Sequence, residues 1–374
     1  MHDGDGNSAA LAGLARRSGT LWREDPRGGF FPHGLRGRKA QVLELVGRWD
    51  DEEAVLRGNL ESAARSGDRL LLARSEYGLA GVLYLKGDNA GALALYRRAL
   101  EGFRDADDTA GIGLVMGGTG SVQRELGDLA AAADCYREQL RLGRQQHDIA
   151  AMSRAHGNLG ILHCLQEKFS EAMENFREKL ALAERLGDQE SIGATVGNMG
   201  NVHKMLGDGR RALECFARQL EIARRLGDKR SIGAAVGNSG VIHTDQGDYP
   251  RAVASLETAL EIASELGDRR GIGIAAANLG IAHRAMGDLA RSERYYDLAI
   301  ATGRRLNARQ YLCGYLSDKA DLMLLAGRLD EAEILVREAL ALAEEVGERP
   351  DIDKCREIAG RISEKRGVVG TGKA

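Results

Sequence analysis

Apolar side chains recur along the chain at the spacing of an amphipathic helix. The segment that ends at Leu226 is typical, with apolar positions at Ala212, Leu213, Phe216, Leu220, Ile222, Ala223 and Leu226. Steps of three and four positions place such side chains on one helical face. Similar segments fill most of the chain, with roughly 16 to 18 residues between successive turns, which is a helix length rather than a strand length. The pattern predicts an all-α protein.

The turns between these segments repeat every 40 residues, for example from Gly87 to Gly127. One set of Gly-Asp pairs begins at Gly87, Gly127, Gly207, Gly247 and Gly287, and a second set, offset by half a period, begins at Gly67, Gly187, Gly227 and Gly267. Glycine takes the left-handed conformation that ends a helix, and Asp accepts backbone N–H groups at the start of the next. Glu167-Lys168 breaks this pattern. The unit is therefore an antiparallel pair of helices.

Each unit also carries small residues at fixed places. The first helix has a glycine (Gly160, Gly200), and the second has an alanine followed one helical turn later by an aromatic residue (Ala172 with Phe176, Ala212 with Phe216). This pattern resembles the tetratricopeptide repeat over about residues 33 to 346. The 40-residue length looks like the repeats of the Pins/LGN adaptor group and of bacterial signalling proteins. The resemblance implies a right-handed superhelical solenoid of antiparallel helix pairs.

The same register predicts the boundaries along the chain. Residues 1–32 are Gly-rich and irregular, and we expect them to be flexible. Residues 33–66 form a degenerate first repeat, and seven 40-residue repeats occupy residues 67–346. Residues 347–374 supply a charged capping helix and a flexible tail, because an open stack must cover its last apolar face.

Composition excludes several classes of protein. The 374 residues are 43% hydrophobic, which excludes an intrinsically disordered chain. The net charge of −3 favours neither nucleic acid nor an anionic membrane surface as partner. No apolar run approaches the roughly 20 residues of a membrane span, and the start of the chain lacks the features of a signal peptide. With five scattered cysteines, these features favour a cytoplasmic protein without membrane insertion.

One stripe of the first helices carries an asparagine in each of four successive units. These residues are Asn158, Asn198, Asn238 and Asn278. The resemblance implies that this stripe lines a concave groove. A side-chain amide can donate to a peptide C=O and accept from a peptide N–H, so such a ladder would hold a peptide backbone whatever its sequence. Alternatively, the asparagines bond to one another or to nearby backbone and only fix the packing of the repeats.

Other candidate peptide-binding residues lie beside the asparagines on the same face or at its margin. They are Arg154, Ile161, Asn201, Lys204, Val241, Ile281 and Arg284. The apolar members favour a partner with apolar side chains. The cations suit an acidic partner segment, but they are dispersed along the chain, which favours a solvated face over a binding role.

The sequence offers no candidate catalytic or metal site. His163, His203, His243 and His283 recur with the repeat period. Successive first helices in a stack stand about 10 Å apart, whereas zinc ligands need bonds of about 2 Å, so the row cannot hold one ion. We expect these histidines to be hydrogen-bonded packing residues, and we expect no enzyme activity, metal or cofactor.

These features favour a non-enzymatic adaptor that holds an extended or amphipathic peptide segment of a partner protein in its groove. The alternative is a regulatory or dimerising module, including a homodimer, that acts on a signalling enzyme such as a cyclase or an ATPase. A third hypothesis is that Trp22, Phe30 and Phe31 fold back into the groove as an internal plug.

Overall fold

The computed structural model describes residues 49–306, 308–347 and 349–371. The segment predicted to be flexible (residues 1–32), the proposed plug residues Trp22, Phe30 and Phe31, residues 33–48 of the degenerate repeat and the end of the tail lie outside this part of the chain. All sixteen elements within it are helices, which confirms the all-α prediction.

The helices fall into two compact units that divide after Gly187. The first unit contains α3 (Trp49–Ser66), α4 (Arg69–Leu85), α5 (Asn89–Asp105), α6 (Thr109–Glu125), α7 (Leu129–Gln145), α8 (Ile149–Leu165) and α9 (Phe169–Leu186). The second unit contains α10 (Gln189–Met205), α11 (Gly209–Leu226), α12 (Lys229–Asp245), α13 (Tyr249–Glu265), α14 (Arg269–Ala285), α15 (Leu289–Leu306), α16 (Arg309–Leu325), α17 (Leu329–Val346) and α18 (Arg349–Thr371). No helix in the described ranges is both long and apolar enough to span a bilayer.

The turns have the predicted chemistry. The glycines that end the helices have φ angles of 65–83°. Eleven aspartates accept a backbone N–H of the following helix at 2.9–3.3 Å; they are Asp68, Asp88, Asp108, Asp128, Asp148, Asp188, Asp208, Asp228, Asp248, Asp268 and Asp288. At the exception, Glu167 still has a φ of 58° and Lys168 makes no side-chain cap. The register persists there without its usual residues.

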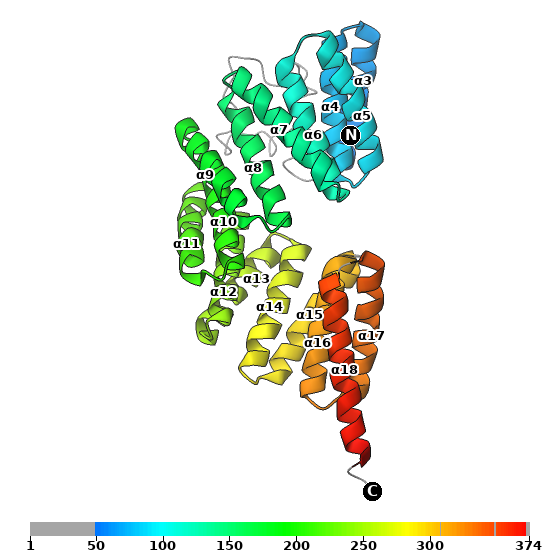
Figure 1. Ribbon diagram of the computed structural model, residues 1–374, viewed down its shortest axis with the longest axis vertical. Coiled ribbons are helices and arrows are strands. Elements are labelled where there is room, and N and C mark those ends of the chain that lie inside the picture. The colour runs from blue at the N-terminus through cyan, green and yellow to red at the C-terminus, as the bar shows by residue number, and fades with distance from the viewer. Residues whose placement is uncertain (1–48, 307, 348, 372–374) are drawn as a thin grey trace, which may run out of the picture. The chain divides into compact units, whose positions relative to one another are not determined.

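Consecutive helices pack as antiparallel pairs, α4 with α5 through α16 with α17, as Figure 1 shows. Ala172 and Ala212 of the second helices are fully buried. A Cβ atom on Gly160 would lie 2.5 Å from the ring of Phe176, and one on Gly200 would lie 2.7 Å from the ring of Phe216. The first helix therefore needs glycine where the aromatic ring of its partner helix rests.

The first helices form the inner layer of the second unit. Each of α10, α12 and α14 contacts the next first helix, and α16 contacts α18, whereas the second helices described here show no comparable contact with one another. Helices that approach more closely lie on the inner side of a curved stack. The helices that carry the asparagine stripe thus belong to the inner layer.

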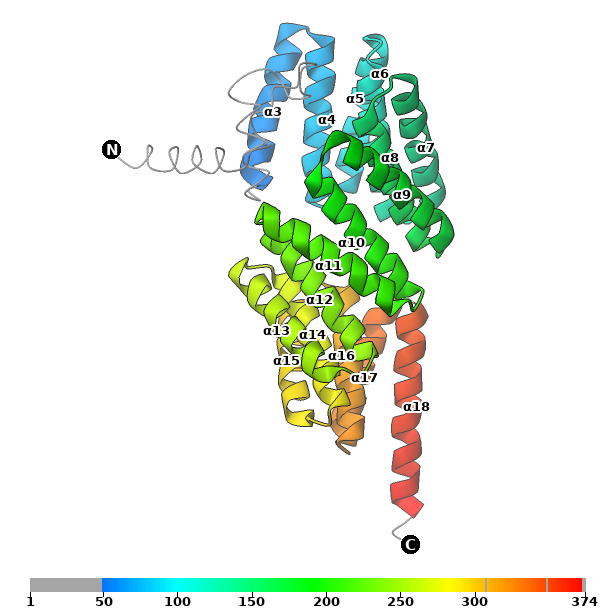
Figure 2. The ribbon, with the colours of Figure 1, turned by 90° about the vertical axis from the view of Figure 1, so that its left-hand side faces the viewer.

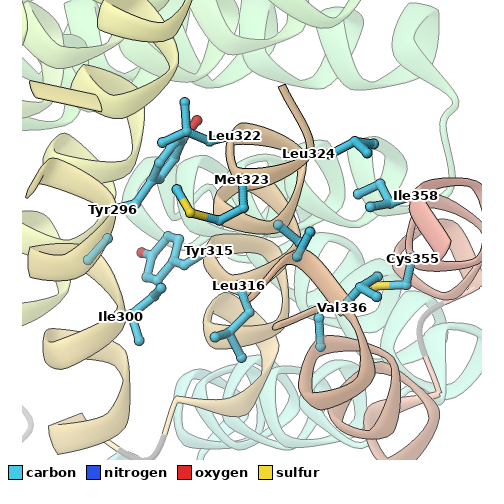
Figure 3. Close-up of a cluster of buried hydrophobic side chains, with 14 of the residues drawn as sticks. Tyr296, Ile300, Tyr315, Leu316, Leu322, Met323, Leu324, Val336, Cys355 and Ile358 are labelled. Carbon is cyan, nitrogen blue, oxygen red and sulfur yellow. The ribbon is translucent and has the colours of Figure 1, made fainter. Parts of the chain in front are cut away.

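The C-terminal end of the second unit is closed by α18. Tyr296 and Ile300 of α15, Leu316 of α16 and Val336 of α17 form a buried cluster to which α18 contributes Cys355 and Ile358 (Figure 3). The 23-residue α18 extends beyond the ends of its neighbours α16 and α17 (Figure 2). Its buried face covers apolar surface that the last helix pair would otherwise expose.

Candidate functional site

Three of the predicted asparagines lie on successive first helices of the second unit. Asn198 is on α10, Asn238 on α12 and Asn278 on α14, and all three are half-buried. The amides of Asn198 and Asn278 make no hydrogen bond to other residues in the described ranges, and neither does that of Asn158, which lies on α8 of the first unit. These amides keep their donors and acceptors available.

Asn238 has a partner in the preceding layer of the stack, where a layer is one antiparallel helix pair, here α10 with α11. The Nζ atom of Lys204, near the end of α10, donates to Oδ1 of Asn238 at 3.3 Å. Burial lowers the pKa of Lys204, and the carboxylate of Asp245 opposes that shift. Because an ammonium group only donates, its contact identifies the amide oxygen and leaves the NH₂ group of Asn238 free to donate elsewhere. The contact with Lys204 thus restrains the orientation of the Asn238 amide.

A cavity of about 290 Å³ opens between α12 and α14, over α13. Asn238 and Val241 line it from α12, and Ile274 and Asn278 line it from α14. Leu256, Ala259, Ile262, Ala263 and Leu266 form an apolar floor that α13 and its end supply. The cavity therefore combines two side-chain amides with an apolar interior, the composition typical of ligand sites.

The inner face changes character towards the C-terminus. Asp318, which occupies the asparagine position on α16, pairs with Lys354 of α18 at 2.7 Å. Arg284 pairs with Asp321, which Arg361 of α18 also approaches at 2.8 Å. The guanidinium of Arg284 is therefore engaged within the protein, and α18 pairs with the acidic residue that stands at the asparagine position of α16.

The remaining predicted site residues lie in different surroundings. Arg154 and Ile161 are exposed on α8 of the first unit. Asn201 is half-buried on α10, and Ile281 on α14 packs against the buried cluster of Figure 3. Of the predicted set, the cavity brings together Asn238, Val241 and Asn278, and Lys204 contacts the first of these.

Sequence reasoning missed Arg230 and Arg270, which line the cavity. Both are exposed, and they lie one repeat period apart near the starts of α12 and α14. Their signal in the sequence was the period itself, since two cations at one register position place their charge on the same edge of neighbouring layers.

His283 does not have the hydrogen bonds expected of it. Its ring is 2% exposed and stacks on Tyr295 at a centroid distance of 5.4 Å. Neither ring nitrogen has a hydrogen-bond partner in the part of the chain described here, although Asp288 lies 4.0 Å away. Burial lowers the pKa of His283, so the neutral ring is favoured. His283 is a packing residue that acts through its ring face.

Two family models match parts of the chain. The Tetratricopeptide repeat model matches residues 191–265 and 231–305, which include the cavity. A model named Anaphase-promoting complex subunit 5 matches residues 153–199. No curated protein matches the chain.

Solved structures share the fold at low sequence identity. A Rap protein complexed with Competence and Sporulation Factor matches with a TM-score of 0.63 at 16% identity, covering 84% of this chain and 85% of that one. The apo quorum sensor NprR from B. thuringiensis matches with a TM-score of 0.58 at 16% identity, covering 76% and 80% of the two chains.

A third structure is a signal transduction ATPase with numerous domains and a tetratricopeptide repeat sensor, from Pyrococcus horikoshii. It matches with a TM-score of 0.56 at 12% identity, covering 85% of this chain and 54% of that one. These likenesses agree with the fold of stacked antiparallel helix pairs. The chain is a repeat protein of the tetratricopeptide type, and the predicted solenoid class is confirmed.

Proposed function

We propose that the chain is a non-enzymatic scaffold that binds an extended segment of a partner protein on the inner face of its second unit. The observation that carries the proposal is the cavity between α12 and α14, which has amides of two successive layers at its wall. First helices about 10 Å apart match about three residues of an extended peptide. Asn238 and Asn278 would therefore hold every third peptide unit.

The orientation of Asn238 adds a direction to this contact. Lys204 occupies its amide oxygen, so its NH₂ group would donate to a peptide carbonyl of the partner. Asn278 has no such restraint from the described residues and would accept or donate. Binding through backbone groups needs no particular partner sequence at these two points.

A random dodecapeptide library displayed on phage tests the proposal. Selection on the full chain is followed by affinity measurements on synthetic peptides with the wild type, with Asn238→Ala and with Asn278→Ala. Loss of one well-placed hydrogen bond corresponds to roughly 0.5–1.5 kcal/mol, so we expect each variant to bind about 2- to 12-fold more weakly. A cooperative melt and an unchanged far-UV spectrum establish that the variants fold.

Peptides that bind both variants as tightly as the wild type would reject the amide mechanism. Asn89→Ala, at the start of α5 in the first unit, is the matched control because it removes an amide far along the chain from the site. We expect this control to leave peptide affinity unchanged.

A second candidate function is that of a regulatory or dimerising module for a signalling enzyme. One observation favours it: the structural match covers 85% of this chain but only 54% of an ATPase that carries a tetratricopeptide repeat sensor. In that case light scattering of the purified chain should show a concentration-dependent dimer. A monomer at all concentrations would remove dimerisation from consideration.

A further inference from the structure

At the cavity, the second helix carries a small residue where the three preceding helix pairs carry a long side chain. In three layers, a glycine of the first helix faces a long side chain of the second helix, at one constant separation along the chain. Gly117 faces Gln139, Gly157 faces Lys179 and Gly197 faces Gln219, and in each case a Cβ atom on the glycine would lie within 3.0 Å of that side chain. Gln139 and Gln219 are buried in these positions.

The layer of α12 and α13 departs from this rule. Gly237 faces Ala259, and a Cβ atom on Gly237 would meet only the Cβ of Ala259, at 3.4 Å. In the next helix pair the facing residues are Ala277 and Ala299, both buried, so the first helix there carries the Cβ that Gly237 lacks. Gly237 and Ala259 both line the cavity, and neither extends a long side chain into it.

The charged residues around the cavity narrow the kind of ligand that fits it. Arg230 makes no ion pair with any residue in the described ranges. Arg270 donates to the hydroxyl of Tyr311 and lies 4.9 Å from the centre of that ring, which leaves its charge uncompensated. The single acidic lining residue, Asp268, uses Oδ1 to accept the N–H of Gly271 at 3.0 Å. The rim is net positive.

We propose that this gap is a specificity pocket that takes one large apolar side chain of the bound segment, with an acidic residue of that segment next to it on Arg230 and Arg270. The inference rests on the proposed function and names the class of segment that is bound. The apolar side chain replaces in this layer what Gln139 and Gln219 supply in others. Arginine and carboxylate form strong charge-assisted hydrogen bonds, which favour Asp or Glu beside the apolar residue.

The substitution Ala259→Gln tests the pocket by restoring the side chain that two other layers carry. Peptides selected from the dodecapeptide library should share a Leu, Ile, Met or Phe beside an Asp or Glu. Burying such a side chain in the empty pocket should contribute at least about 10-fold to affinity, so Ala259→Gln should lose that factor in fluorescence polarisation. Ala254→Gln, the same change at an exposed position of α13, should leave affinity within twofold.

Gly237→Leu fills the pocket from the opposite helix and decides the question if Ala259→Gln fails to fold. Peptides that require Asn238 but bind both filled variants as tightly as the wild type would overturn the pocket and leave the proposed function standing. Recovery of no peptide that requires Asn238 or Asn278 would overturn both. Selected sequences without a shared apolar position would also overturn the pocket.

Two further measurements would reveal a different occupant of the pocket. If the chain with Trp22→Ala, Phe30→Ala and Phe31→Ala binds the selected peptides at least about 10-fold more tightly, the N-terminal segment is the natural occupant and the proposal of a separate partner fails. If Ala259→Gln instead abolishes a dimer seen by light scattering, the occupant is a second copy of the chain.

Discussion

Single residues set the start and end of each helix, and this level of the structure follows from the sequence. A glycine ends a helix because it takes a positive φ without strain, and an aspartate begins the next because its carboxylate accepts a free N–H. Three turns reach the same geometry with other residues: Asp107, His147 and Glu167 have φ angles of 50°, 54° and 58°. Neighbouring repeats impose the turn even where the local residues disfavour it.

The turn between α8 and α9 should therefore be improvable. Replacing Glu167 by Gly removes the strain of a left-handed side chain, and replacing Lys168 by Asp supplies the absent cap. Caps contribute about 1 kcal/mol and the relief of the left-handed residue about the same, so we expect the double variant to gain roughly 2 kcal/mol. Urea unfolding measures this gain. Asp148→Ala, which removes an existing cap, should lose about 1 kcal/mol, and a double variant no more stable than the wild type would contradict the expectation.

At the scale of helix pairs, the sequence predicts which helices pair but not the cavity that the pairing leaves. The pairing itself follows from the 40-residue register, since Gly200 and Phe216 occupy fixed places in their unit. The cavity could not be foreseen, because it depends on the volumes of Gly237 and Ala259, which face each other only when α12 packs on α13. The orientation of Asn238 likewise depends on Lys204, which belongs to the preceding repeat.

Two glycine substitutions compare the packing of the helix pair beside the cavity with that of a helix pair whose facing position is filled. Gly237→Ala should stabilise the protein by about 1 kcal/mol, because alanine favours a helix and its Cβ would make an ordinary 3.4 Å contact with Ala259. Gly197→Ala, at the same register position in the preceding helix pair, should destabilise it by about 1–3 kcal/mol, because its Cβ would lie 2.6 Å from the buried side chain of Gln219. Denaturant midpoints measure both. Equal effects of the two substitutions would show that the layers are packed alike.

The whole chain divides into two compact units at Gly187. In repeat proteins each helix pair contacts only its neighbours, so stability is a sum of local contributions and a part can fold without the rest. We expect residues 49–187 and 188–374, expressed as separate chains, to be helical by circular dichroism and to unfold cooperatively. If either fragment shows no unfolding transition, the units are not independent, and the full chain must fold as one.

The spacing between facing residues is the same for Gly197 with Gln219 as for Gly237 with Ala259. The position of the cavity can therefore be moved from one helix pair to another by substitution. Replacing Gln219 by Ala and Ala259 by Gln would move the cavity by one helix pair, about 10 Å. This distance equals about three residues of an extended chain. A ligand anchored there would have to slide along the wall or carry its anchor at a different place in its own sequence. Under the proposed function, two substitutions would then change the peptide specificity of the protein without changing any turn.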